Sequence, residues 1–311
     1  MMKDQILVVG GAGYIGSHMV KMLVQADYPV VVLDNLCTGF ADAARYGKLV
    51  EGDLADTSLL DRLFDEHRFA AVLHFAALSQ VGESMQIPER YYRNNVANTL
   101  NVLEAMNRYE VRRFIFSSTA AIFGEPQYTP IDDGHPARPI NPYGRSKRMV
   151  EEILHDLSQS QDLRYVCLRY FNAAGADPEG ELGERHDPES HLIPLVLQAA
   201  NGRRDQIAVF GSDYDNPDGT CVRDYIHVWD LCTVHLLSLE HLLRGGASLA
   251  LNLGNGRGFS VQEVIDSARR VTGGRILVRK ESRRPGDPAV LVADSRQAHT
   301  ILGWQPRYAD L

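Results

Sequence analysis

Cysteine is scarce in this sequence and is not arranged in pairs. The four cysteines are spread over 311 residues without a CxxC motif, and they are Cys37, Cys167, Cys221 and Cys232. This spacing argues against a disulfide framework and matches no cysteine metal site, so we expect no bound metal. Unpaired cysteine is typical of a reducing compartment, and we predict a cytoplasmic location.

Long apolar runs and an excess of positive charge are also missing. No stretch has the length and hydrophobicity of a membrane span, and we expect no signal peptide at the start. The 32 Lys and Arg are outnumbered by 40 Asp and Glu, which gives a formal net charge of −8. Because this charge repels phosphate backbones and anionic lipids, the sequence predicts neither nucleic acid nor a membrane as partner. An anionic substrate would need a local basic site.

What the sequence does contain is a series of short, β-branched apolar runs with helical patterns between them. The runs are continuous in apolar residues, as strands covered by helices on both faces require, and they span residues 6–9, 30–33, 71–75, 113–116 and 164–168. This alternation predicts an α/β fold with a Rossmann-type, doubly wound parallel sheet. After about residue 172 the pattern changes to loops rich in Gly, Pro and Asp. We therefore predict a Rossmann domain over residues 1–171. Residues 172–311 form mainly a smaller, mixed α/β substrate-binding lobe, interleaved with the first domain.

A glycine-rich motif, GGAGYIG, follows the first apolar run directly at residues 10–16 and precedes a helical pattern. Its glycines, Gly10, Gly13 and Gly16, permit a tight turn and a close approach of the backbone to a pyrophosphate. That pyrophosphate would meet the positive end of the helix dipole. This context predicts that the first domain binds a dinucleotide.

The second apolar run ends in Asp34, which is 18 residues after Gly16. A carboxylate at this place accepts hydrogen bonds from the hydroxyls of the adenosine ribose. It also repels a 2′-phosphate, and no Arg follows it directly, so the sequence favours NAD over NADP. The alternative is that Asp34 only caps a loop. Asp53, after the third strand, is either an adenine contact or a turn residue.

Tyr143 and Lys147 occur in the motif NPYGRSK at the start of a further amphipathic helix. A spacing of four residues places the phenol and the ammonium on one helix face. The ammonium, helped by the positive nicotinamide, would lower the pKa of the phenol, so Tyr143 is the candidate general base. Thr119 follows the run at 113–116 and is the third candidate, because its hydroxyl can polarise the reacting oxygen or relay its proton. A YxxxK pair alone is usually an accident of a solvated helix face, but the upstream dinucleotide motif makes this one significant.

Together these motifs resemble those of the extended short-chain dehydrogenase/reductases, and among them the UDP-glucose 4-epimerases. The most specific segments are HLIPLVLQAANGRRD (191–205), VFGSDYDNPDGTCVRDYIHV (209–228), LNLGNG (251–256) and RRPGDPA (283–289). The resemblance implies interconversion of UDP-glucose and UDP-galactose, by NAD-dependent oxidation to a 4-keto intermediate and re-reduction on the opposite face. It also implies a homodimer formed through helices of the Rossmann half.

The resemblance further implies which residues make contact with each ligand. Those expected at NAD are Gly10, Gly13, Tyr14, Ile15, Gly16, Asp34, Asn35, Asp53, Leu54, Phe75, Ala76, Ala77, Asn94, Ser117, Tyr143, Lys147 and Tyr170. Those expected at the UDP-sugar are Thr119, Tyr143, Asn172, His191, Leu192, Phe210, Arg223, Arg284, Asp287 and Leu291. Arginine suits forked contacts with phosphate oxygens, although Arg223 and Arg284 could instead form ordinary surface ion pairs. The ring of Phe210 either stacks on uracil or belongs to the core.

Three positions depart from the pattern of the family. Thr119 stands where Ser is frequent, a change that preserves the hydroxyl. His191 stands where some members have Asn, and it either contacts the substrate or caps a helix. Leu291 stands where some have Tyr. It either widens the sugar pocket enough for an acetamido group or is a packed strand residue.

Other functions remain open at this point. One is a 4-epimerase of another UDP-hexose or of a UDP-N-acetylhexosamine. A sugar-nucleotide 4,6-dehydratase needs an acid that Thr119-Ala120-Ala121 does not offer. A non-catalytic NAD-binding protein is disfavoured because Tyr143 and Lys147 are both present.

Overall fold

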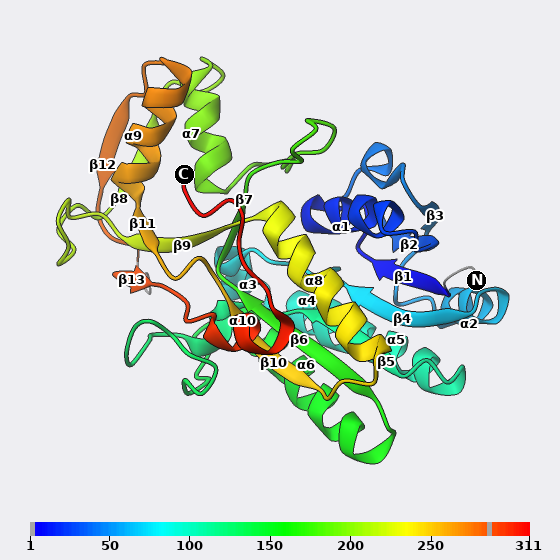
Figure 1. Ribbon diagram of the computed structural model, residues 1–311. Coiled ribbons are helices and arrows are strands. Elements are labelled where there is room, and N and C mark those ends of the chain that lie inside the picture. Colours follow the sequence, from blue (N-terminus) through cyan, green and yellow to red (C-terminus); the bar gives the residue numbers. More distant parts are fainter. Residues whose placement is uncertain (1–3, 285–287) are drawn as a thin grey trace.

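The larger part of the fold is a seven-stranded parallel sheet, seen edge-on in Figure 1. The structure is a computed structural model that describes residues 4–284 and 288–311. The spatial order of the strands is β10-β6-β5-β4-β1-β2-β3. Their bounds are β1 (Gln5–Val9), β2 (Val30–Asp34), β3 (Lys48–Glu51), β4 (Phe69–His74), β5 (Arg113–Ser117), β6 (Arg164–Tyr170) and β10 (Leu249–Leu253). The predicted Rossmann-type sheet is confirmed, and all five predicted runs are strands in it.

Both faces of this sheet are buried, which explains why its strands are apolar without alternation. In β1, Ile6 and Val8 point into one hydrophobic core, while Leu7 and Val9 point into another on the opposite face. The first core is shared with helices α1 (Tyr14–Gln25), α8 (Val228–Leu243) and α10 (Arg296–Leu302). The second is shared with α2 (Thr57–Glu66), α5 (Asn98–Arg108) and α6 (Pro142–Ser160).

Short helical segments connect these elements near the carboxyl ends of the strands. They are η1 (Ala41–Ala44), α3 (Val81–Gln86), α4 (Pro88–Tyr92), the π-helical turn η2 (Arg93–Ala97) and the 3-10 turn η3 (Ala120–Phe123). Among the described residues, none of the helices combines the length and the hydrophobicity needed to cross a membrane.

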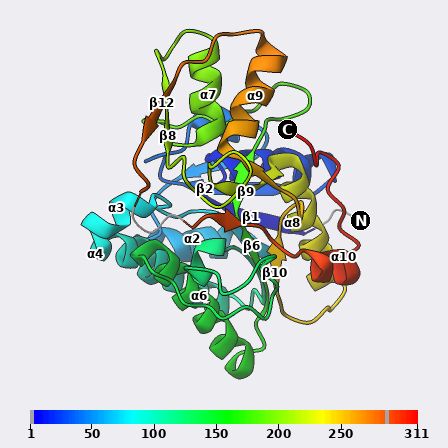
Figure 2. The same ribbon diagram turned by 90° about the vertical axis from the view of Figure 1, so that its left-hand side faces the viewer.

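The second lobe stands above the carboxyl ends of the large sheet, at the top of Figure 2. Its helices α7 (Leu192–Ala200) and α9 (Val261–Thr272) lie side by side and share a core with β8 (Ile207–Phe210). A parallel pair joins β8 to β12 (Val278–Glu281). The remaining strands gather around β9 (Val222–His227), and they are β7 (Asn172–Ala174), β11 (Gly258–Ser260) and β13 (Val290–Leu291).

The two parts of the chain are interleaved. Strand β10 lies far along the chain, yet it pairs in parallel with β6 and forms one edge of the large sheet. Helix α8 also returns from the second lobe and packs against α1. The predicted boundary at residue 171 stays a prediction, because elements on both sides of it build the same sheet.

Candidate active site

The site begins where the strands of the large sheet end. Because the strands are parallel, their carboxyl ends lie at one edge, with Val9 of β1 paired to Leu33 of β2 and to His74 of β4. Strand β1 therefore stands between β2 and β4. The chain first continues from β1 to β2 and β3 on one side, and then returns to β4 on the other side. Doubly wound sheets bind ligands in the crevice that this change of direction creates.

The glycine-rich turn after β1 has no room for a side chain at Gly10 or at Gly16. A Cβ on Gly10 would lie 2.4 Å from the backbone nitrogen of Ala76, and the φ of Gly10 is +79°. A Cβ on Gly16 would lie 2.1 Å from the carbonyl oxygen of Gly10. Gly13 is the N-cap of α1 and supplies no side-chain cap, and the first turn of α1 carries no acidic residue. The amide groups and the positive dipole end of α1 are thus suited to an anion such as the pyrophosphate of a dinucleotide.

Asp34 caps the loop after β2, and its predicted contact with the adenosine ribose stays a prediction. Its Oδ1 accepts a hydrogen bond from the backbone N–H of Leu36 at 2.9 Å, which caps the loop after β2. Its Oδ2 accepts one from the N–H of Ala12 at 2.9 Å, which fixes the carboxylate against the glycine-rich turn. A carboxylate has about four lone-pair sites, so Asp34 keeps acceptor capacity for ribose hydroxyls.

A cavity of about 290 Å³ lies beside the glycine-rich turn. One wall is formed by the start of α1, including Gly13 and Tyr14, and another by residues 181–185 of the segment between β7 and α7. The Tyr14 hydroxyl donates a hydrogen bond to the carbonyl of Gly175 at 2.7 Å, which ties this segment to α1. This cavity therefore adjoins the start of α1, whose amide groups are suited to an anion.

Helix α6 presents Tyr143 to Thr119 through close backbone packing. Its N-cap, Asn141, accepts a hydrogen bond from the N–H of Gly144 at 2.8 Å, and Pro142 occupies the first turn. A Cβ on Gly144 would lie 2.4 Å from the carbonyl oxygen of Ala121, so the glycine lets α6 touch the turn that carries Thr119. Burial raises the pKa of Tyr143, and its side-chain hydrogen bond with Thr119 acts in the opposite direction.

Lys147 is one turn further along α6 and is 3% exposed. Its ammonium donates to the carbonyl of Ser117 at 2.7 Å and lies 4.7 Å from the centre of the Phe116 ring. Burial lowers the pKa of Lys147 to about 7, although the Cys167 and Glu151 side chains oppose this shift. Lys147 is therefore directed at the strand end. Burial is the dominant effect on the pKa of the Tyr143 phenol here, so its lowering by Lys147 and the nicotinamide together stays a prediction.

Comparison with known proteins identifies the family. A model of the NAD dependent epimerase/dehydratase family matches residues 6–254, which include the glycine-rich turn, Asp34, Thr119, Tyr143 and Lys147. The chain belongs to the NAD dependent epimerase/dehydratase family. The prediction of NAD as the cofactor agrees with this membership.

The relatives carry the resemblance further. This epimerase/dehydratase family member is 53% identical to a UDP-glucose 4-epimerase of Halalkalibacterium halodurans over 98% of this chain and 92% of the relative. Its fold matches the UDP-glucose 4-epimerase from Brucella ovis in complex with NAD, with a TM-score of 0.97, 50% identity and coverage of 99% and 95%. It also matches the UDP-Glc/GlcNAc 4-epimerase from Campylobacter jejuni, with a TM-score of 0.87, 44% identity and coverage of 99% and 95%. The predicted resemblance to UDP-glucose 4-epimerases is confirmed.

The structure gathers most of the other predicted cofactor residues at the same sheet edge. The backbone N–H groups of Phe75 and Ala76 both donate to the carbonyl of Val9, at 2.8 and 3.2 Å, and Ala77 follows them directly. The hydroxyls of Ser117 and Tyr170, from the adjacent ends of β5 and β6, are hydrogen-bonded to each other. We call Gly10, Gly13, Gly16, Asp34, Ser117 and Tyr170 the sheet-edge group.

Four predicted cofactor residues lie around this group and interact mainly through local contacts. Asn35 donates to Asp53 at 2.7 Å, and Asp53 also accepts the backbone N–H two residues after it, so Asp53 does make a turn. The carbonyl of Leu54 accepts from an asparagine of α5 at 2.9 Å. The carbonyl of Ile15 lies 3.8 Å from the Cys232 sulfur of α8.

The predicted substrate residues of the second lobe fall on neighbouring strands. Arg223 is in register with Leu291 across β9 and β13. Asn172 donates from its side chain to the carbonyl of Asp224, 3.2 Å away, at the start of β7. In a second pair, the Arg284 guanidinium lies 4.9 Å from the centre of the Phe210 ring.

We call Asn172, Leu192, Phe210, Arg223, Arg284 and Leu291 the lobe group. The ring of Phe210 is 37% exposed, which argues against a role in the core. Leu291 packs against the hydrophobic cluster around η3, which adjoins Thr119. Asp287 lies outside the described residues.

His191 does not cap a helix. It is the residue before α7, but its side chain makes no capping hydrogen bond. Its Nδ1 is instead hydrogen-bonded to the carboxylate of Glu184. The capping alternative is therefore wrong, because a carboxylate from the preceding loop competes for the ring.

Sequence reasoning missed Asn95, which holds the catalytic helix in place. Asn95 is 2% exposed and lies beside Asn94, the predicted residue, in the π-helical turn η2. Its side chain bonds the N–H and the carbonyl of Leu78, both at 2.9 Å, and donates to Ser146 at 3.0 Å. Ser146 lies between Tyr143 and Lys147 on α6. The doubled asparagine in YYRNNV is the signal that could have revealed it, since π-helical turns are frequent at functional sites.

Proposed function

We propose that this protein interconverts UDP-glucose and UDP-galactose with NAD as its cofactor. The observation that carries the proposal is the convergence of Thr119 and Tyr143 with the sheet-edge group at one edge of the large sheet. The relatives named above, which share about half of the sequence over nearly the whole chain, support the choice of substrate.

The sheet-edge group would hold NAD. The glycine-rich turn would bind its pyrophosphate, Asp34 its adenosine ribose, and Lys147 with Ser117 the part nearest the reaction. When bound, NAD supplies a reversible hydride acceptor for C4 of the sugar and a positive charge that favours the phenolate. Tyr143 would take the proton of the 4-hydroxyl as C4 is oxidised, with Thr119 polarising the same oxygen. After the 4-keto sugar has rotated within the site and C4 has been reduced on its opposite face, Tyr143 would return the proton to the oxygen on C4.

The lobe group would hold the UDP portion of the substrate. Phe210 offers an exposed ring for uracil, and Arg284 and Arg223 offer guanidinium groups for the diphosphate. Asn172 and Leu192 would complete the contacts, as would Asp287, which lies outside the described residues. His191 is not included, because its ring is engaged by Glu184. The diphosphate would be held firmly and the hexose loosely. This difference would permit the 4-keto sugar to rotate within the site, so that its opposite face meets the cofactor.

A single incubation separates the possible functions. The purified protein is incubated with UDP-galactose, and the nucleotide sugars are resolved by chromatography. UDP-glucose is the expected product. A 4-keto-6-deoxy sugar would indicate a 4,6-dehydratase instead, and unchanged UDP-galactose would indicate a non-catalytic protein.

The position of Leu291 supports a second pair of substrates, UDP-N-acetylglucosamine and UDP-N-acetylgalactosamine. This side chain lies beside the turn that carries Thr119, where an aromatic residue would occupy more volume. The extra space would admit an acetamido group, and the Campylobacter jejuni relative is named a UDP-Glc/GlcNAc 4-epimerase. We therefore propose some turnover of UDP-N-acetylglucosamine. Leu291→Tyr should suppress it selectively; equal loss of both activities, or no acetylated turnover in the wild type, would contradict this.

Assembly and location are also proposals. We infer a homodimer formed through helices of the Rossmann half, which light scattering of the purified protein would test. The four cysteines are free, which supports a reducing compartment such as the cytoplasm.

A further inference from the structure

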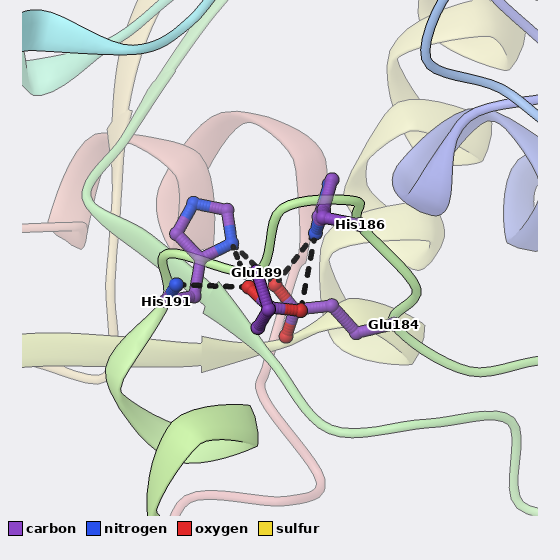
Figure 3. Close-up of side chains that lie close together, drawn as sticks. All are labelled: Glu184, His186, Glu189 and His191. Carbon is purple, nitrogen blue, oxygen red and sulfur yellow. Dashed lines mark hydrogen bonds and ion pairs between the residues drawn. The ribbon is translucent and has the colours of Figure 1, made fainter. Parts of the chain in front are cut away.

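Four side chains converge in the loop between β7 and α7, as Figure 3 shows. They are Glu184, His186, Glu189 and His191, and one ligand atom from each lies within 4.8 Å of all the others. The two glutamate residues are half-buried, and their side chains have exposed fractions of 6% and 7%. Two buried carboxylates in one place need a compensating positive charge.

Protons on the histidines do not account for the whole arrangement. His191 does hydrogen-bond Glu184. His186 Nδ1, however, is buried and has no hydrogen-bond partner, although it lies 3.5 Å from Glu184 Oε1 and 3.6 Å from Glu189 Oε2. The distance from His191 Nδ1 to Glu189 Oε1 is 3.8 Å. These separations are too long for good hydrogen bonds.

The two separations of His186 Nδ1 from the carboxylates, 3.5 and 3.6 Å, suit atoms that surround a metal ion, and His191 would exchange its hydrogen bond to Glu184 for a bond to that ion. In a tetrahedral zinc site with bonds of about 2.0–2.2 Å, neighbouring ligand atoms lie about 3.3–3.6 Å apart. Two imidazole nitrogens and two carboxylate oxygens are ligands that Zn²⁺ accepts. The two carboxylates would also cancel the charge of the ion. Four protein ligands leave no open coordination position, which is typical of a structural site.

A neighbouring acidic cluster differs from the cluster around His186 because it contains a cationic side chain. Asp177, Glu179 and Glu181 also gather their carboxylates, but the ammonium of Lys21 lies among them, at 2.7, 2.6 and 2.7 Å. This cluster already contains its cation and has no need of a metal. The cluster around His186 has no such lysine or arginine among its described ion pairs.

We propose that Glu184, His186, Glu189 and His191 bind one Zn²⁺ ion as a structural clamp. The ring of His186 packs edge-on against Tyr14 at 6.3 Å between centroids, and Glu184 also lines the cavity beside the glycine-rich turn. His191 directly precedes α7. The ion thus fastens the loop both to the start of α1 and to the start of α7, and it fixes one wall of the cofactor cavity.

The test uses the full-length protein and measures the metal directly. After treatment with a chelator and removal of the chelator, the protein is titrated with Zn²⁺, and bound zinc is quantified by plasma mass spectrometry. We expect one zinc per chain. Cobalt added in place of zinc should give the strong visible absorption of a tetrahedral site, and zinc should raise the Tm.

Two variants and a control make the result specific. His186→Gln and Glu189→Gln should each weaken zinc binding by at least about 10–100-fold, the loss that even outer-shell changes cause. His155→Gln, at an exposed histidine of α6 outside the cluster, should bind zinc as the wild type does. Circular dichroism verifies that each variant is folded. If His186→Gln does not fold, Glu189→Gln alone provides the test. Substoichiometric zinc in the wild type, an octahedral cobalt spectrum or wild-type zinc affinity in both variants would overturn the proposal, whatever the epimerase assay shows.

Discussion

The sheet-edge group and the lobe group are built in different ways. The first depends on backbone: its glycines touch neighbouring main-chain atoms, and its polar side chains are held by hydrogen bonds at strand ends. The second depends on side chains that extend from short strands, and two of its members, Phe210 and Arg284, are exposed. The first group therefore resists substitution, whereas the second can change without disturbing the fold. Under the proposed function, the first group would retain the cofactor and the second would choose the substrate.

The largest effect is expected at the boundary between the two groups, from Tyr143→Phe. The change removes the proton acceptor but little volume, so kcat should fall about 10²–10⁴-fold. Binding of UDP and of NAD should stay close to wild type, which calorimetry and cofactor analysis would verify. Unchanged turnover would dismiss Tyr143 as the base.

Gly16→Ala tests the claim that the sheet-edge group depends on backbone. The new Cβ would lie 2.1 Å from the carbonyl oxygen of Gly10, so the turn must move. We expect a loss of about 1–3 kcal/mol in the free energy of unfolding, as for other overpacked sites. The wild type should keep its NAD through purification, and the variant should lose it.

The matched control for this change is Gly82→Ala. Gly82 is also helical, in α3, but a Cβ there meets nothing within 4 Å. If Gly16→Ala retains NAD as Gly82→Ala does, the clash with the Gly10 carbonyl does not control cofactor binding.

The pH dependence of stability sharpens the account of Lys147. Burial lowers its pKa from 10.5 to about 7, so above pH 7 the unfolded chain binds one more proton than the folded chain. Its contribution therefore makes the dinucleotide-free protein more stable as pH rises from 7 to 9, by at most about 1.4 kcal/mol per pH unit. Urea unfolding of Lys147→Met should show a flatter slope over this range. Parallel curves for the two proteins would mean that the ammonium is not desolvated.

The smallest effect is expected in the lobe group, from Arg284→Ala. Loss of one charge-assisted contact to the diphosphate should raise the KM for UDP-galactose about tenfold, with kcat and stability nearly unchanged. Arg283→Ala is the matched control, because this neighbouring arginine is also exposed and its ion pair with Asp213, at 2.8 Å, keeps it outside the lobe group. If both changes raise KM equally, the diphosphate responds to the overall positive charge of this segment and makes no specific contact with the Arg284 guanidinium.

The dinucleotide half of the protein was the easier half to predict. Its strands are buried on both faces and so are continuously apolar, and its glycines stand together in one short motif, although the contact that requires Gly10 is with distant Ala76. The spacing of Tyr143 and Lys147 is likewise a local property of one helix. Each of these signals can be read in a short window of sequence.

The remaining features depend on partners that are distant in sequence or on loops without periodicity. Asn95 is decisive because it bonds Leu78 and Ser146, and no local pattern announces those contacts. Glu184 and His191 are close in the chain, but nothing in their spacing states that an irregular loop turns both side chains inward. The direction of the Lys147 ammonium was missed for a similar reason, since the Ser117 carbonyl belongs to another element.

Strand β10 has a consequence for the order in which the protein folds during synthesis. Until residues 249–253 have left the ribosome, β6 has an unpaired edge, although every other strand of the large sheet is already available. An open, apolar strand edge invites pairing with another chain. The first part of the second lobe, from β7 to β9, and helix α8 must be synthesised during that interval. The nascent protein is therefore most vulnerable to aggregation late in translation, and arrest just before residue 249 should make it depend most strongly on chaperones.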